Sequence, residues 1–193
     1  YFQDTVSSFT FDNYSVSLGG FYWLGNRLRL GLGGMYMWEK YEQIDNADIG
    51  YQDKEFNFNK YQVRFRTDYE GINQHYEFRE GTSLSFFSEM IQTEGVPEAS
   101  FFKATTRFKY FKRLGKNGNL GLQNQLGIST NNDSPFAPFV LDGFINVRGI
   151  GNRVERGTAE FIINAEYLHT VLKKKYFIAQ LAAFSDYGAC LLY

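Results

Sequence analysis

The sequence predicts an all-β chain, and more specifically an antiparallel transmembrane β-barrel of which this chain holds eight strands. Aromatic residues make up 19% of the chain, with 20 Phe and 14 Tyr, while Pro occurs 3 times. Such a composition is typical of strands. Apolar and polar residues alternate with a period of two in eight segments, and no segment has the 3.6-residue period of a helix. The segments exceed about ten residues, as membrane-spanning strands do, whereas soluble strands cluster near five or six.

The alternation is cleanest in the third segment, where Tyr61, Val63 and Phe65 share one face and Gln62 and Arg64 share the other. Short turns are predicted between segments at 24–26, 70–73, 116–119 and 171–174, where glycine, asparagine and charged residues gather. The predicted strands are 11–24, 27–40, 58–69, 76–91, 101–113, 120–130, 158–170 and 175–191.

The connections between these segments alternate between short and long. The prolines, Pro97, Pro135 and Pro138, all fall in the long ones. Outer-membrane barrels have short periplasmic turns and long extracellular loops, so this pattern favours a barrel in the bacterial outer membrane. A soluble β-sandwich or lipocalin-like barrel is the alternative, because periodicity does not say whether an apolar face meets lipid or a protein core.

Charge and composition exclude several classes of function. The net charge is −1, from 20 Lys and Arg against 21 Asp and Glu, so there is no basic footprint for nucleic acid. Mean hydropathy is −0.37 and no run of about 18 apolar residues occurs, which argues against a membrane-spanning helix. Barrel strands also have modest hydropathy because their two faces differ. Cys190 is the single cysteine, so no disulfide forms within the chain.

No group of residues points to catalysis or to a metal. His75 and His169 lie far apart and no Cys/His spacing suggests zinc. Ser-His-Asp groupings, P-loops and dinucleotide fingerprints are absent from the sequence. The acidic stretch 41–55 lacks the spacing of a calcium loop and is predicted to be a solvated surface loop. We therefore expect no enzyme, no cofactor and no metal site.

Basic residues gather on the predicted inward faces of several strands. They either form an anion-attracting wall or line a hydrated interior together with acidic partners such as Asp68 and Glu89, and the sequence favours the second interpretation. The inward basic residues are Arg27, Arg29, Lys60, Arg64, Arg66, Lys103, Arg107 and Lys109.

Three motifs near the end of the chain place charged residues where they can meet. Val147-Arg148-Gly149-Ile150 lies in the long loop 131–157, Asn164-Ala165-Glu166-Tyr167 in the seventh segment and Phe184-Ser185-Asp186-Tyr187-Gly188 in the eighth. A period of two allows Glu166 and Asp186 to point inward together from neighbouring strands. A guanidinium engages carboxylates bidentately, so Arg148 is the natural partner. Alternatively, Arg148 sits in a solvated loop and both carboxylates face water.

In this order and spacing, the motifs resemble the end of the barrel shared by BamA-type insertases and two-partner-secretion translocators, the bacterial surface antigen family. In that superfamily the Val-Arg-Gly loop folds back into the barrel lumen. Two positions depart from the pattern: Ile150 stands where an aromatic residue is usual, and Leu168 where a basic one is common. The resemblance implies an internal lock formed by Val147, Arg148, Gly149, Glu166 and Asp186, supported by Asn164, Phe184 and Gly188.

The resemblance also implies a function. We expect residues 1–193 to be one portion of a barrel of about 16 strands, incomplete at both ends, that inserts or translocates polypeptides at the bacterial outer membrane. The expected partners are outer-membrane lipid, client polypeptides, the missing strands and periplasmic POTRA-type modules. The alternative is a passive pore or a small structural barrel of eight strands.

Overall fold

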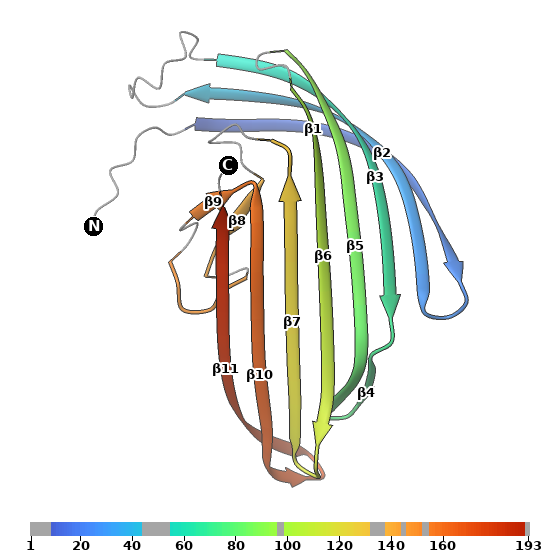
Figure 1. The fold of residues 1–193 in the computed structure, drawn as a ribbon, viewed down its shortest axis with the longest axis vertical. Helices are drawn as coiled ribbons and strands as arrows, with labels where there is room; N and C mark the ends of the chain where they lie inside the picture. Colours follow the sequence, from blue (N-terminus) through green and yellow to red (C-terminus); the bar gives the residue numbers. More distant parts are fainter. Residues whose placement is uncertain are drawn as a thin grey trace.

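The computed structural model describes residues 9–43, 55–95, 99–131, 138–143, 146–151 and 155–191 (Figure 1). All regular structure in these ranges is β-strand. They contain no helix long and apolar enough to cross a membrane. Three strands are short: β4 (Asn73–His75), β8 (Phe139–Leu141) and β9 (Glu155–Gly157). The long strands are β1 (Phe9–Leu24), β2 (Leu28–Gln43), β3 (Glu55–Glu70), β5 (Phe78–Gly95), β6 (Ala99–Leu114), β7 (Gly118–Ser129), β10 (Ala159–Lys174) and β11 (Phe177–Leu191).

The long strands form one antiparallel sheet in the order β1-β2-β3-β5-β6-β7-β10-β11. Short β4 pairs with β5, and β8 pairs with β9 in a separate hairpin. The all-β, antiparallel prediction is confirmed. The sheet is curved but not closed, because the edge strands β1 and β11 do not pair with each other (Figure 1). It is therefore not the closed eight-stranded barrel that the sequence left as an alternative.

Two predicted turns were misplaced by a few residues. The turn predicted at 116–119 lies at 115–117, because Gly115 takes the positive φ of 67° and Gly118 begins β7. The turn predicted at 171–174 belongs to β10, which remains paired with β11 as far as Lys174 opposite Phe177. The pairing register between β10 and β11 shifts between Thr170 and Leu172, and the two strands stay paired beyond this shift. At both places, hydrogen bonding between the paired strands outweighed the local preference of these residues for a turn.

The remaining differences concern short elements. The strand predicted at 76–91 begins at Phe78, and Tyr76 with φ 52° forms the turn that joins β4 to β5. The hairpin of β8 and β9 inside the loop 131–157 was not predicted, because strands of three residues are too short to show a period. Most of the acidic stretch 41–55 lies outside the described residues, and its ends belong to β2 and β3.

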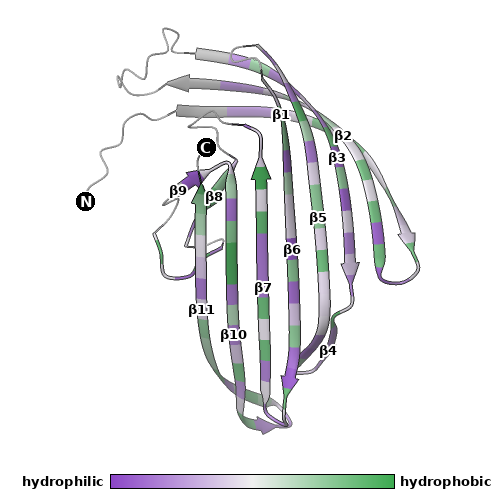
Figure 2. Ribbon diagram, in the orientation of Figure 1, coloured by the Kyte–Doolittle hydropathy of each residue, from purple (hydrophilic) through white to green (hydrophobic). Residues whose placement is uncertain are grey.

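The register gives the sheet one apolar face and one polar face. A continuous row across five strands runs Leu18, Gly34, Val63, Met90 and Phe102, all on the convex face. The alternation is visible along β3, β5 and β6 in Figure 2. Many convex-face apolar side chains are more than half exposed, among them Val16, Leu18, Leu32, Val63, Met90, Ile128, Leu181 and Tyr187.

The concave face carries most of the charged side chains of the strands, and they are largely paired. Arg29 and Arg66 both engage Asp68, with nitrogen–oxygen distances of 2.6 and 2.8 Å. The Glu89 carboxylate forms ion pairs with Arg64 on one side and with Lys103 on the other, at nitrogen–oxygen distances of 3.2 and 3.9 Å. Positive charges that alternate with carboxylates across the strands agree with a hydrated, nearly neutralised wall and not with an anion-attracting one.

The hairpin of β4 and β5 crosses the concave side of β6 and reaches strands that β5 does not pair with. The Asn119 amide of β7 accepts from the Arg79 backbone N–H at 3.1 Å and donates to its carbonyl at 2.7 Å. The Arg113 guanidinium stacks on Phe78, 4.2 Å from the ring centroid. Glu77 at the hairpin tip meets Lys173 of β10 at 2.6 Å. This hydrogen bond lowers the pKa of the Glu77 carboxyl below its usual range.

Asn119 is only 3% exposed, so its loss would leave two Arg79 backbone groups unpaired. We expect Asn119→Ala to lower the free energy of unfolding by about 2–4 kcal/mol, which is the lower part of the roughly 1–3 kcal/mol for each of two unsatisfied groups, because Arg79 itself is exposed. Denaturant titration of the purified protein measures this. Asn124→Ala is the control, since that amide makes one long hydrogen bond of 3.3 Å to the Ile162 carbonyl. Equal losses in the two variants would show that Asn119 does not anchor the hairpin.

Candidate functional site

The loop that carries Arg148 is folded upon itself before it contacts the sheet. The Asp142 carbonyl accepts from the backbone N–H groups of Asn146 and Val147, at 3.0 and 3.2 Å. The Asn146 side chain accepts from the Asp142 N–H at 2.8 Å and donates to the Val140 carbonyl at 2.8 Å. A further bond joins Gly143 N–H to the Gly151 carbonyl at 3.0 Å. The loop therefore presents Val147 and Arg148 from a closed, hydrogen-bonded turn.

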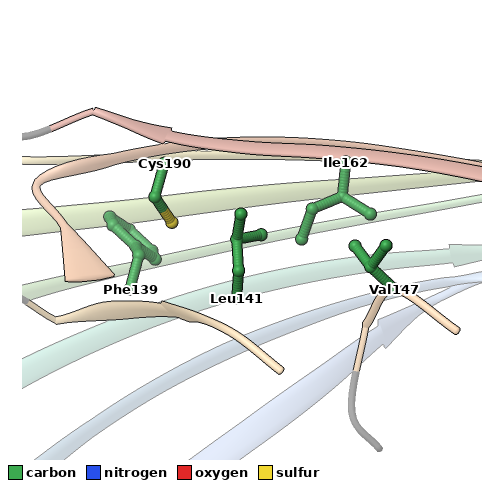
Figure 3. Close-up of a cluster of buried hydrophobic side chains, with 5 residues drawn as sticks. All are labelled: Phe139, Leu141, Val147, Ile162 and Cys190. Carbon is green, nitrogen blue, oxygen red and sulfur yellow. The ribbon is translucent and has the colours of Figure 1, made fainter. Parts of the chain in front are cut away.

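An apolar cluster fixes this turn against the concave face of β10 and β11. Figure 3 shows Phe139, Leu141 and Val147 of the loop pointing toward Ile162 and Cys190 of the strands. Each of the five is less than 10% exposed, and Ile162 is the most buried at 1%. Burial of such side chains contributes roughly 1.5–3 kcal/mol each for the larger ones. This cluster is the main apolar core among the described residues, and it lies between loop and sheet.

Gly188 leaves the space that Val147 occupies. A Cβ atom at position 188 would lie 2.5 Å from Val147 Cγ2 and 3.0 Å from Leu141 Cδ2. Real Cβ atoms do not approach so closely, so a larger residue here would displace the loop. This steric requirement explains why the segment Phe184-Ser185-Asp186-Tyr187-Gly188 ends in glycine.

Arg148 binds both carboxylates that the sequence placed on the inward face. Its Nε and one terminal nitrogen donate to the two Asp186 carboxylate oxygens, at 2.7 and 2.8 Å. The backbone N–H of Arg148 donates to Asp186 Oδ2 as well, at 3.0 Å. The other terminal nitrogen donates to Glu166 Oε2 at 2.9 Å. The planar guanidinium therefore spans two strands, with a bidentate contact on β11 and a single contact on β10.

The environments of the two carboxylates differ. The Asp186 side chain is 2% exposed, whereas those of Arg148 and Glu166 are about 40% exposed. A carboxylate so removed from water is costly unless it is paired and hydrogen-bonded. Phe184 supports the arginine from one side, with the guanidinium carbon 4.0 Å from the ring centroid. The hydrogen bonds to Asp186 and Glu166 raise the pKa of Arg148 above its usual range, so the group stays charged.

The predicted supporting residues lie around this contact. Asn164 donates from its side chain to the Asn146 carbonyl at 2.9 Å, which ties the loop to β10. Gly149 has φ 89°, a conformation that glycine adopts without strain. Of the two departures from the family pattern, Ile150 is partly exposed and Leu168 faces a cavity. All eight predicted residues thus lie at the junction of the loop with β10 and β11.

Sequence reasoning missed Asn146 and the apolar cluster. Asn146 closes the turn that begins at Asp142 and Gly143, and the Asp-Gly pair was the available signal for it. Leu141, Ile162 and Cys190 showed no signal of their own, because only the folded loop brings them together.

Two adjoining cavities lie beside the lock. The larger, about 350 Å³, is lined by Arg148, Asn146, Gln123 and residues shared with its neighbour. The smaller, about 240 Å³, extends to the β4–β5 hairpin and is lined by Gln74, Glu77 and Gln180. Arg79, Phe111, Gly121 and Glu166 line both. No group of three or more potential metal ligands occurs in the ranges that the structure describes.

The sequence matches no protein-family model, and no curated protein is similar to it. The site is therefore interpreted from its own geometry.

The geometry predicts an order of severity for substitutions in the lock. Arg148→Ala leaves Asp186 buried without its positively charged partner and with the backbone N–H of residue 148 still bonded to it, so we expect a loss of about 2–4 kcal/mol of unfolding free energy, below the roughly 3–5 kcal/mol of fully buried pairs. Glu166→Gln removes one contact to a half-exposed carboxylate and should cost less than about 1 kcal/mol. Arg148→Lys should rescue poorly, because an ammonium does not reach both carboxylates as a planar fork. Denaturant unfolding and protease protection of the loop measure these effects.

A double-mutant cycle with Arg148→Ala and Asp186→Asn provides the control. Groups in direct contact show a coupling energy, whereas independent sites give additive losses. Strict additivity of the two losses would contradict the lock.

The space under Val147 gives an independent prediction. We expect Gly188→Ala to displace the loop and to cost roughly 1–3 kcal/mol, as overpacking of a core does. Gly20→Ala is the matched control, since a Cβ there meets nothing within 4 Å. Protease protection of the 138–151 loop reports displacement directly. Unchanged protection in Gly188→Ala would mean that the strand glycine does not position the loop.

Proposed function

We propose that this chain is part of an outer-membrane β-barrel whose protein inserts or translocates polypeptides. The observation that carries the membrane part is the exposed apolar face, which continues over all eight long strands. Soluble monomers rarely expose apolar patches beyond a few hundred Å². One representative from each strand in sheet order is Leu18, Leu32, Val63, Met90, Phe102, Ile128, Ile163 and Tyr187.

Aromatic residues border this face at two levels, as they do at the two interfaces of a bilayer. Tyr14 packs on Trp38 with ring centroids 5.7 Å apart at the long-loop end, and Tyr22 and Tyr69 lie near the short turns. On β2, residues 28–38 connect the two levels. The ten steps between them at about 3.4 Å each span about 34 Å, or about 26 Å at a strand tilt near 40°. This height agrees with an apolar band of about 25 Å.

The polar concave face supports the same proposal. Ion pairs line β2, β3 and β5, while the loop with Arg148 covers β10 and β11. This distribution of charge is expected of an aqueous lumen that is narrowed by an inward loop. The resemblance of the three motifs to the insertase and translocator superfamily directs the proposal to polypeptides as clients.

The open edges complete the proposal. β1 and β11 each present one row of unpaired backbone groups, which is very costly in hydrocarbon. We propose that further strands of the same protein or assembly pair with both edges and close a larger barrel of about 16 strands. Periplasmic modules of the POTRA type would deliver clients to it.

Charge on the convex face tests the membrane contact. We expect Val63→Arg to destabilise the membrane-inserted protein by about 2–4 kcal/mol, because the charge would lie near the middle of the bilayer. Ser17→Arg is the control: Ser17 lies at nearly the same height but on the concave face, through the register Ser17–Met35–Gln62. Folding equilibria in phospholipid vesicles give both values. Equal costs for the two variants would contradict an apolar face in lipid.

The parent protein tests localisation and function together. It should fractionate with outer membranes and migrate differently in gels before and after boiling; recovery as a detergent-free soluble monomer would contradict the membrane proposal.

A photocrosslinker at Thr105 faces the concave side and one at Thr106 the convex side. We expect polypeptide adducts at 105 and lipid adducts at 106 in cells. A passive pore would give no foreign polypeptide at 105.

A further inference from the structure

The short-turn ends of β6–β7 and β10–β11 lie together at one end of the sheet (Figure 1). The Thr170 N–H donates to the Asn117 carbonyl at 2.8 Å, which joins the two hairpins directly. The β4–β5 hairpin joins them again, because Glu77 pairs with Lys173 while neighbouring Phe78 stacks under Arg113. The two turns therefore form one continuous surface.

This surface, called the basic rim below, is rich in lysine. Two of its six cations contact the β4–β5 hairpin: Lys173 pairs with Glu77, and Arg113 stacks on Phe78 and also donates to the carbonyls of Gly115 and Lys116. The other four are exposed and form no ion pair with any residue that the structure describes, and Lys175 lies 5.2 Å from the ring centroid of its neighbour Tyr176. These four are Lys112, Lys116, Lys174 and Lys175.

Apolar side chains adjoin these lysines on the convex face. Leu172 and Phe177 are exposed on β10 and β11, and Leu114 is exposed at the end of β6. Lys112 and Lys174 themselves point to the convex face, since they pair with Leu120 and Phe177 in the register. The basic rim thus lies where the apolar face ends, which is the level of lipid headgroups if that face contacts the bilayer.

The other short turns lack this charge. The β1–β2 turn holds one cation, Arg27, and β3 has the acidic residues Asp68 and Glu70 at its end, just before the β3–β4 connection. At the opposite end of the sheet, the convex face carries a negative charge at Glu94, whose carboxylate accepts a hydrogen bond from the Tyr61 hydroxyl at 3.2 Å. The positive charge is therefore localised to one end of the β6–β11 half and is not a general property of the strand ends.

We propose that the basic rim binds the headgroups of anionic phospholipids in the leaflet at the short-turn end of the barrel. This inference rests on the proposed membrane location and adds a lipid preference to it. Lysine ammonium groups bind phosphate as point charges. The acyl chains would lie along Leu172, Phe177 and Leu114.

Phosphatidylglycerol is the probe. The detergent-purified full-length protein is titrated with phosphatidylglycerol or phosphatidylcholine and the bound lipid is counted by native mass spectrometry. A cation near a membrane surface strengthens anionic-lipid binding by about fivefold. We expect Lys174→Gln/Lys175→Gln to weaken phosphatidylglycerol binding roughly twentyfold and to leave phosphatidylcholine binding unchanged. Salt should weaken the wild-type preference, because exposed charges are screened.

Arg27→Gln/Lys109→Gln is the charge-matched control, since it removes two positive charges away from the basic rim and should retain the preference. Equal affinity of the wild-type protein for both lipids overturns the proposal, as does an unchanged preference in the Lys174/Lys175 variant. Displacement of phosphatidylglycerol by equimolar inorganic phosphate also overturns it, since the site would then recognise free phosphate. A protein that needs detergent but shows no preference contradicts the basic rim alone, whereas a soluble monomer contradicts the membrane proposal.

Discussion

Asp186 is the constraint on which the arrangement of the concave side depends. Its carboxylate is almost fully removed from water, and a charge in that position requires a partner. Arg148 supplies three hydrogen bonds to it, one of them from the backbone, so the pair fixes the main chain of the loop as well as the side chain. Because Arg148 also reaches Glu166, a single guanidinium joins the loop to two neighbouring strands.

The charged contact determines where the loop lies, and the apolar cluster contributes most of the buried surface. Val147 precedes Arg148 and enters the space above Gly188, so the two interactions use adjacent residues of the loop. The β4–β5 hairpin covers the same half of the sheet from the other end, through Asn119 and Lys173. On β1–β3, by contrast, a groove of about 300 Å³ remains, lined by Gly19, Gly33 and Arg64.

Under the proposed function, this division of the concave face would matter for a barrel that handles polypeptides. The loop and the hairpin narrow the half formed by β6–β11, while the half formed by β1–β3 keeps a polar, ion-paired wall. The basic rim lies at the short-turn end of this narrowed half, so lipid bound there would contact the barrel on one side only. A barrel with anionic lipid bound on one side would be oriented in its leaflet by that contact.

The sequence by itself predicted the strands and their alternation, and the eight residues assigned to the lock came from the resemblance of the three motifs to the insertase and translocator superfamily. Period-two alternation is a local property, and motif spacing fixes which side chains of one strand share a face, so Glu166 and Asp186 were placed together without coordinates. Turn positions were less certain, as Gly115 and Lys174 show, because pairing between strands overrides the local preference for a turn.

Only the tertiary structure decided which side chains make contacts between elements that are distant in the sequence. Asn119 reaches Arg79 past an intervening strand, and Ile162 and Cys190 become core residues once the loop folds over them. These contacts join residues up to 51 positions apart, from Phe139 to Cys190, and no local pattern encodes them. The edges of the sheet were also decided in three dimensions, because closure depends on the curvature of the whole sheet and not on any one strand.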